Sequence, residues 1–349
     1  MSTTTSSSIS GAYQNHFSKE MLDHAIPAVV LAQFGSKAGV KKNDGALGVT
    51  WFRRVAATNN SSGRVANVQS ITEGTAISSF TNATLTAVSA TLLQIGEACK
   101  VTDIVGYTAL FDMLAQNIGL MAEDCVLETD NIIRDAIVAG SPTTLYAGGA
   151  ADFSALNSLS KAAGKFRMLD ALIAVTKLKR NRAPRMKGGH YIGAIPVEVS
   201  FDLQNDPDWI GVARYQNAKG IYNAEIGMFG GARFVEHTNP FVETSSGTEG
   251  TFADPGVSAT TRVVSSLFFG QGGFGVPAFD GQQIPGDTRD EKDQVKQTGV
   301  KPQVIIADKA DKSDPLNQFM TAGWKMHWIA KVLNTSWLVQ ARSKTEFNG

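Results

Sequence analysis

Residues 105–139 read VGYTALFDMLAQNIGLMAEDCVLETDNIIRDAIVA and carry the strongest helical pattern in the chain. Their apolar residues recur mostly at steps of three and four, which places them on one face of a helix. These residues are Leu110, Leu114, Ile118, Met121, Cys125, Ile132 and Ala136. Asp103 is a suitable N-cap, and Gly140, Ser141 and Pro142 would end the helix. At ~1.5 Å a residue the rod would be ~50 Å long, which is long for a compact domain.

The segment before this helix, residues 49–100, has the composition of an extended arm. Residues 49–55 (VTWFRRV) alternate as a strand, and residues 59–63 (NNSSG) form a turn cluster. Few large side chains lie between Ala56 and Ala90, so the segment cannot build a core of its own. We therefore expect a long β-arm that lies on another surface.

Still nearer the N-terminus, the chain reads as a polar tail, a short helix and an apolar anchor. Ser18 could cap a helix that Pro27 interrupts, and residues 29–34 (VVLAQF) would carry on as the anchor. Beyond the long helix, we predict further helices at 166–180 and 196–203 and a buried strand at 191–195. Later strands are expected at 232–235, 262–269, 304–306, around 324–328 and at 337–339. Because helices and strands are segregated along the chain, an α+β fold is predicted.

Composition limits the class of protein. Only 18% of the 349 residues are charged, against a usual ~25%, and basic and acidic residues balance at 32 each. There is thus no overall basic field of the kind that nucleic-acid readers carry. Cys99 and Cys125 lie in no metal or redox motif, so we predict two buried thiols. Neither a signal peptide nor a run of ~18 apolar residues is found, which favours synthesis in a cytoplasm without a membrane span.

No catalytic constellation emerges from the motifs. Residues 270–275 (GQGGFG) match the glycine pattern of a dinucleotide site, but residues 276–281 (VPAFDG) cannot open the helix that such a site needs. We predict a turn between strands there. Residues 158–161 (SLSK) lack the partner motifs of a serine acyl-transfer enzyme, and His327 is expected in a half-buried strand. The prediction is a non-enzyme without catalytic residues, metal or cofactor.

Two charge features are open to more than one interpretation. A run without a single acid contains Lys177, Lys179, Arg180, Arg182, Arg185 and Lys187. It could complement a helix dipole and continue into a solvated loop, or it could form an inner face that touches DNA phosphates without reading sequence. On the long helix, Glu123, Asp124, Glu128 and Asp130 are expected on a solvated or interface face.

Short stretches in collinear order give the chain a resemblance to a known family. They are MLDHAIPAVVLAQFG (21–35), WFRR (51–54), EG (73–74), LQIGE (93–97), TD (102–103), NDPDWI (205–210), NAEIG (223–227), GGARFVE (230–236), DPLN (314–317), GWK (323–325), LN (333–334) and Trp337. In these the chain resembles tailed-phage major capsid proteins of the Hong Kong 97-type fold, in the branch named for the coat protein of phage N-four. The stretches span nearly the whole chain.

The resemblance implies a division of the chain. The implied parts are an N-terminal arm (1–48), an extended loop across a neighbouring subunit (49–100), a peripheral domain (101–189) with a spine helix (105–139), an axial domain (190–320) and strands returning to the peripheral domain (321–349). Arg53, Arg54, Arg64 and Glu73 are candidates for ion pairs between subunits. As exposed pairs they would be worth only ~0–1 kcal/mol each.

The resemblance also implies a function. Copies would assemble in the host bacterial cytoplasm into hexamers and pentamers of an icosahedral head that encloses double-stranded DNA. A portal is an implied partner, and a decoration protein is left open. The initial Met1, without a long preceding region, favours a separate scaffolding protein. No lysine occurs between Lys42 and Lys100, so no Lys–Asn crosslink from the loop is expected. The alternatives are a nanocompartment (encapsulin-like) shell, a nucleotide-dependent enzyme and a minor decoration or tail protein.

Overall fold

The computed structural model describes residues 30–41, 48–54, 73–74, 85–108, 113–209, 224–243, 262–278, 297–298, 300, 302–307 and 318–347. The predicted helix at 18–27 and turn cluster at 59–63 lie outside these ranges. Where one helix from 105 to 139 was predicted, the structure has α2 (Asp103–Thr108) and α3 (Met113–Ala139), and residues 109–112 between them are outside the described part. Of the helices described, none is both long and apolar enough to cross a membrane.

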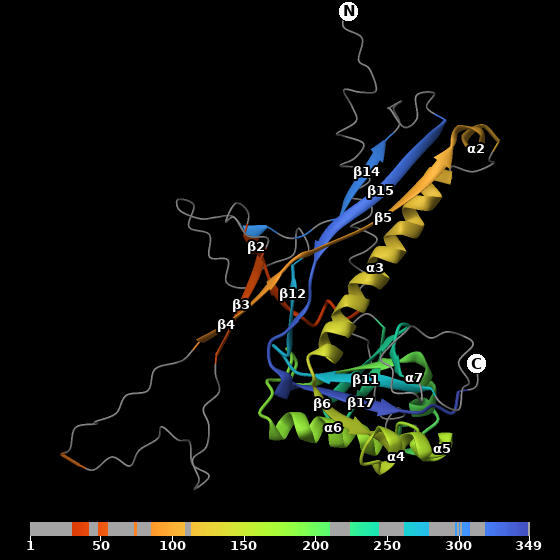
Figure 1. Ribbon diagram of the computed structural model, residues 1–349. Coiled ribbons are helices and arrows are strands. Elements are labelled where there is room, and N and C mark those ends of the chain that lie inside the picture. Colours follow the sequence, from red (N-terminus) through yellow and green to blue (C-terminus); the bar gives the residue numbers. More distant parts are fainter. Residues whose placement is uncertain are drawn as a thin grey trace, which may run out of the picture.

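A seven-stranded sheet forms the lower half of the molecule (Figure 1). Its strands follow the order β6-β17-β11-β7-β9-β8, and β10 pairs with β11. Their bounds are β6 Thr143–Tyr146, β17 Leu338–Ser343, β11 Val263–Phe269, β7 Tyr191–Pro196, β9 Ala232–His237, β8 Glu225–Phe229 and β10 Phe241–Glu243. Every residue of β7 and β11 is buried, as expected for strands covered on both faces.

The two faces of this sheet are covered by different helices. Along β7, Tyr191 and Ile195 pack with α6 (Met168–Arg180) and α7 (Val197–Gln204), whereas Ile192 and Ala194 pack with α3. The alternation follows from the two-residue period of a strand. The short helices α4 (Phe153–Ser158) and α5 (Lys161–Gly164) precede α6. Asp152 caps α4, Ser160 caps α5 and Asp170 accepts from the Arg167 backbone N–H at the start of α6.

A second, three-stranded sheet accompanies the upper part of α3. Its order is β14-β15-β5, with bounds Gln303–Ala307, Phe319–Trp328 and Leu93–Thr102. In β15 alternate residues from Ala322 to Trp328 are buried, and Trp324 and Met326 pack with Cys125 of α3. His327 is half-buried in this strand, as predicted. Burial raises the pKa of the Cys125 thiol to about 12, in keeping with a buried, unreactive thiol, and Cys99 is half-buried.

Two further small sheets contain strands of the N-terminal segment. Strand β1 (Ser36–Ala38) runs parallel to β12 (Phe274–Pro277), whose other edge pairs with β16 (Lys331–Val332), and β2 (Val40–Lys41) pairs with β13 (Gln297–Thr298). The glycine motif at 270–275 is a turn between β11 and β12, as predicted, and the chain continues as a strand. Gly272 adopts φ +77°, which favours glycine.

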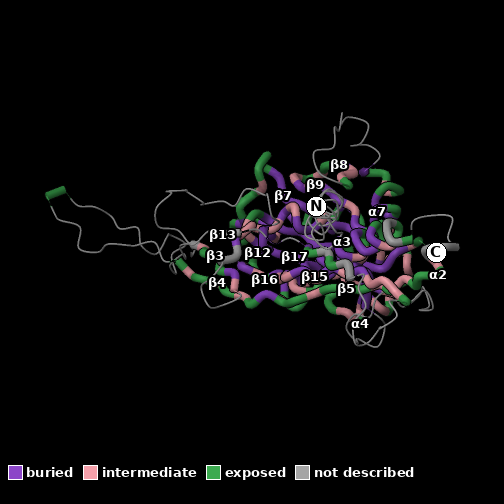
Figure 2. The backbone as a smooth tube through the Cα atoms, turned by 90° about the horizontal axis from the view of Figure 1, so that it is seen from above, coloured by how far each residue is buried: buried purple, intermediate pink, exposed green. Residues whose placement is uncertain are grey.

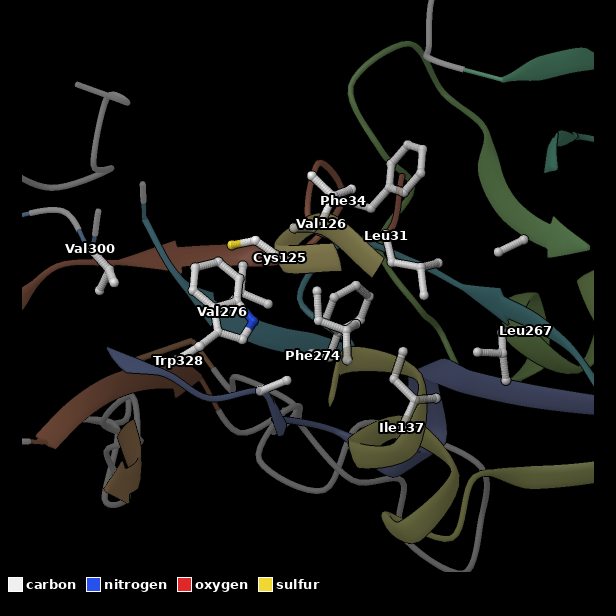
Figure 3. Packing of buried hydrophobic residues seen from close by; sticks show 14 of the residues in the cluster. Leu31, Phe34, Cys125, Val126, Ile137, Leu267, Phe274, Val276, Val300 and Trp328 are labelled. Carbon is white, nitrogen blue, oxygen red and sulfur yellow. The ribbon is translucent and has the colours of Figure 1, made fainter. Parts of the chain in front are cut away.

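The largest hydrophobic core joins segments far apart in the sequence. It gathers Leu31 and Phe34 from the N-terminal segment, Ile137 from α3, Leu267 from β11 and Trp328 from β15 (Figure 3). The ring centroids of Phe34 and Phe269 are 5.7 Å apart, and those of Phe269 and Phe274 are 5.2 Å apart. The predicted apolar anchor at 29–34 is thus confirmed for its described residues, since this segment completes the core between α3 and the large sheet.

Candidate assembly surfaces

A two-stranded ribbon leaves the body of the molecule. It consists of β3 (Gly48–Arg54) and β4 (Leu85–Thr91), which pair antiparallel. Its inner face carries Val49 and Trp51, which pack with Leu92 and Leu333 in a small core. The Trp51 indole Nε1 donates to the Ser36 carbonyl at 2.9 Å, and only a glycine at 275 leaves room for that indole. The inner face is therefore fixed to the body of its own chain.

The outer face of the ribbon has no such cover. Phe52 is 72% exposed and Leu85 is 65% exposed. Phe52 lies opposite Ala87, two residues from Leu85, so the two large side chains are diagonal neighbours on one face. Figure 2 shows β3 and β4 at the margin of the molecule with much of their length exposed. Thr50 and Ser89 on the same face hydrogen-bond to each other, so the apolar part is the patch of Phe52 and Leu85, which a contact with another chain would bury.

Residues 85–102 link this ribbon to the three-stranded sheet. Strand β4 ends at Thr91 and β5 begins at Leu93, with only the buried Leu92 between them. Strand β5 then pairs with β15 along its whole length, from Leu93 opposite Trp328 to Thr102 opposite Phe319. The ribbon is thus directly continuous with the sheet beside α3.

Asp130 of α3 holds the N-terminal segment by its backbone. Its carboxylate oxygens accept hydrogen bonds from the amides of Val30 at 2.9 Å and Leu31 at 3.0 Å. Burial raises the pKa of this carboxyl to about 6, against the opposing effect of the amide hydrogen bonds. The expectation that Asp130 lies on a solvated or interface face is wrong. Ile133 and Ile137, which are buried, follow Asp130 by three and seven residues. This spacing places Asp130 on the same face of the helix and could have indicated its burial from the sequence.

A second buried group on α3 was also missed from the sequence. The guanidinium of Arg134 is buried and its Nη1 donates to the Asn239 carbonyl, the Asn239 side-chain oxygen and the Pro240 carbonyl, at 3.2, 3.2 and 3.4 Å. Asn239 also donates to the side-chain oxygen of Asn131. Burial, assisted by the Arg134 charge, lowers the pKa of the nearby His237 to about 4. These contacts join α3 to the connection between β9 and β10.

The four charges predicted for intersubunit ion pairs are not gathered in one place by the described structure. Arg53 is half-buried on the inner side of β3, and Glu73 is exposed in a turn with Gly74. The backbone of Arg54 lies opposite Leu85, while its side chain and the whole of Arg64 are outside the described part. Their role in ion pairs stays a prediction.

The six residues of the basic run differ in their surroundings, because one is half-buried against its own chain and five are exposed. Lys177 is half-buried, its Nζ donates to the Thr144 carbonyl at 3.1 Å, and burial lowers its pKa. Arg185 is exposed and donates to the Gly189 carbonyl at 3.4 Å. The other four, all exposed, are Lys179 and Arg180 at the end of α6 and Arg182 and Lys187 in the following loop. Within the described ranges, no group of three or more His, Cys, Asp or Glu side chains could hold a metal ion.

Comparison with known proteins identifies the fold. No protein-family model matches the chain, and no curated protein is detectably similar in sequence. Solved structures match over most of their length. The capsid of Ralstonia phage GP4 has a TM-score of 0.60 at 12% identity, with 90% of this chain and 87% of that chain covered. The head of Helicobacter pylori bacteriophage KHP40 has a TM-score of 0.57 at 9% identity, with 89% and 88% covered.

A third structure, the capsid of cyanophage Pam1, has a TM-score of 0.55 at 11% identity and covers 88% of this chain and 87% of that chain. At such identities the likeness is one of fold. The class is therefore an α+β fold shared with phage capsid proteins, as predicted. More particularly, it is the Hong Kong 97-type fold of tailed-phage capsids that the resemblance implied. The assignment to the N-four branch stays a prediction.

Proposed function

We propose that this chain is the major capsid protein of a tailed phage, which assembles into hexamers and pentamers of an icosahedral head around double-stranded DNA. The observation that carries the proposal is the fold shared with phage capsid and head structures along nearly the whole of both chains. A match of this extent leaves little of the chain for another domain. The role is structural, in the virion, and involves no catalysis.

The ribbon fits this role on physical grounds. Its outer face exposes Phe52 and Leu85, so its extended form gains little from its own chain beyond the inner core around Trp51. Contact with a neighbouring subunit would bury that apolar face and offset the entropy lost on ordering the arm. Because the ribbon and the surface that it meets differ, the contact is heterologous, and such contacts form a ring when the rotation between neighbouring copies closes.

We propose domains that follow the sheets and so revise the limits expected from the sequence. The peripheral domain would contain α2, α3 and the sheet of β5, β14 and β15. The axial domain would contain the seven-stranded sheet with α4 to α7. In this division β6, before residue 190, and β17, after residue 320, belong to the axial domain, because both are strands of that sheet. Of the final strands, only β15 returns to the peripheral domain.

The proposal is tested by negative-stain electron microscopy of the purified protein, alone and with a candidate scaffolding protein from the same genome. We expect closed shells, or hexamers and pentamers that become shells when scaffold is added. A uniform small oligomer that never forms a shell with any scaffold would contradict the proposal. Shells that carry a protein cargo and no DNA in their native host would favour a nanocompartment.

The basic loop after α6 is proposed to touch packaged DNA. Arg182, Arg185 and Lys187 are exposed and lie in a stretch without acids, so they can neutralise phosphates without sequence readout. Exchanging Arg182 and Lys187 for Glu should lower the genome content of assembled particles, measured as nucleic acid per shell. The matched control is Glu at Lys100 and Lys331, exposed in β5 and β16, which makes the same net-charge change. Unchanged genome content in the loop variant would remove the DNA role.

A further inference from the structure

Helix α6 is apolar on the side that faces away from the sheet. Its inner residues, among them Ala171, Ala174 and Leu178, belong to the core beneath the seven-stranded sheet. Three large aliphatic residues lie on its exposed side, Leu169, Leu172 and Ile173, at 65%, 38% and 37% exposure, and Leu172 at its margin also contacts Gly230 in the turn between β8 and β9. A helix that covers a sheet ordinarily has a polar outer side, so this side is a surface that a partner would bury.

The same outer side becomes basic toward the end of the helix. Lys179 and Arg180 follow Leu172 by seven and eight residues, which places them on the same face two turns further on. Both are exposed, and the exposed Thr176 lies between the apolar and the basic parts. We call the set Leu169, Leu172, Ile173, Lys179 and Arg180 the α6 outer face. Its partner must combine an apolar stripe with acids.

Helix α3 carries a surface of that description. Met113, Leu120 and Leu127 repeat at seven-residue steps on its outer side, and Leu120 is 58% exposed. Glu123, Asp124 and Glu128 flank this stripe, and both glutamates are exposed. We call these six residues the α3 outer face. On both helices a charged residue lies eight residues after a leucine. Glu128 follows Leu120 on α3, and Arg180 follows Leu172 on α6.

We propose that the α6 outer face of one copy packs against the α3 outer face of a second copy. In a parallel alignment Leu120 would meet Leu172, and Glu128 would meet Arg180 about 12 Å further along both helices. A single chain cannot make this contact with itself, because α3 and α6 cover opposite faces of the large sheet (Figure 1). The contact is heterologous and repeats from copy to copy. It rests on the proposed shell function and adds a second interface beside the ribbon.

DNA is the competing occupant of the α6 outer face. Phosphates would pair with Lys179 and Arg180, but they would leave Leu169, Leu172 and Ile173 against a strongly polar backbone. The α3 helix of a second copy can cover the leucines and isoleucine with apolar side chains and pair Lys179 and Arg180 with acids. The opposed signs of the two helices therefore favour a protein partner, and they favour this chain because it presents the complementary stripe itself.

The test is a charge exchange. One variant carries Glu at Lys179 and Arg180, and a second carries Lys at Glu123 and Glu128. The third, the exchanged variant, carries all four changes. Association is measured by sedimentation velocity of the full chain, under conditions in which the unchanged protein associates, so the result is defined whether or not shells close. The unchanged protein reports separately on the proposed function by forming shells or failing to do so.

We expect each two-residue variant to weaken association about tenfold or more, because like charges then face each other across the contact. The exchanged variant should recover most of that loss, since its charges are again opposite. A control variant with Glu at Lys100 and Lys331, exposed in β5 and β16, makes the same net-charge change outside both faces and outside the basic loop, and it should associate like the unchanged protein. All the changed side chains are exposed, and unchanged thermal unfolding checks the fold.

Two results would overturn the inference. Association that is unaffected by either two-residue variant would show that these faces do not meet. Association that both variants weaken, but that the exchanged variant fails to restore, would show that they act through different partners. If the α6 variant forms normal shells with less DNA, the face belongs to DNA, and the shell function stands without this interface.

Discussion

Asp130 ties the stability of the subunit to pH through a single carboxyl. Its pKa in the folded chain, about 6, is raised above the ordinary 3.8, so the folded state binds a proton more readily than the unfolded state between these values. Its contribution is thus most favourable at low pH, and it declines as pH rises through about 6. The full difference corresponds to about 3 kcal/mol.

This linkage is checked with Asp130→Asn, which has no titrating group at this position. In urea unfolding of unassembled subunits, the free energy of unfolding of the unchanged protein relative to the variant should fall between pH 4 and pH 7. The hydrogen bonds from the amides of Val30 and Leu31 determine the part of the difference in unfolding free energy that does not depend on pH. Titration of the carboxyl determines how that difference changes with pH. Parallel pH profiles would refute the assignment.

Arg134 is expected to matter for stability far more than an exposed arginine. Replacement by Met leaves the carbonyls of Asn239 and Pro240 without their buried donor, which should lower the free energy of unfolding by about 3 kcal/mol. Arg180→Met, on the solvent side of α6, is the control and should change it by less than about 0.5 kcal/mol. Chemical denaturation measures both. Equal effects would mean that the Arg134 contacts contribute nothing specific.

Neither Asp130 nor Arg134 was identified from the sequence as a structural group. Helical spacing placed them on α3, but their burial depends on chain segments about 100 residues away, at Val30 and at Asn239. A local sequence pattern does not reveal partners so distant along the chain. The basic run shows the opposite case, since its charge was evident from the sequence, yet only the fold separated Lys177, bound to the Thr144 carbonyl, from the exposed members.

At the scale of elements, the outer face of the ribbon should act between subunits and not within one. Phe52→Ser together with Leu85→Ser removes two exposed apolar side chains, so the unassembled subunit should unfold as before. Assembled shells should dissociate at lower denaturant concentration, because apolar contact between copies is lost. The control, Trp51→Ser on the inner face, should destabilise the subunit itself. Shells of unchanged resistance would exclude the outer face as a contact.

Elements with a strong local pattern were predicted well. The apolar period located α3, α6 and β7 to within a few residues, except at the start of α3, where α2 precedes it. Sheet partners could not be predicted, because pairing depends on contacts distant in sequence. The parallel pairing of β1 with β12, which joins Ser36 to Gly275, has no local signal at all.

For the whole molecule, we expect a shell held by non-covalent contacts alone. The sequence from 43 to 99 contains no lysine, so the loop cannot supply the amine of a Lys–Asn isopeptide bond. Mature particles boiled in detergent should run on a gel as single chains of 37.2 kDa. A ladder of covalent oligomers would refute this expectation and would point to a lysine outside the loop.

The position of β17 also bears on when the subunit can fold during synthesis. This strand lies inside the large sheet, between β6 and β11, yet it is formed by residues 338–343, which the ribosome adds after every other described strand. Until then β11 lacks one neighbour, and the first-made anchor at Leu31 lacks much of the core that it enters. The large sheet of a nascent chain is therefore complete only after residues 338–343 have been synthesised, so copies being made side by side on one messenger RNA cannot associate in their native form before that point.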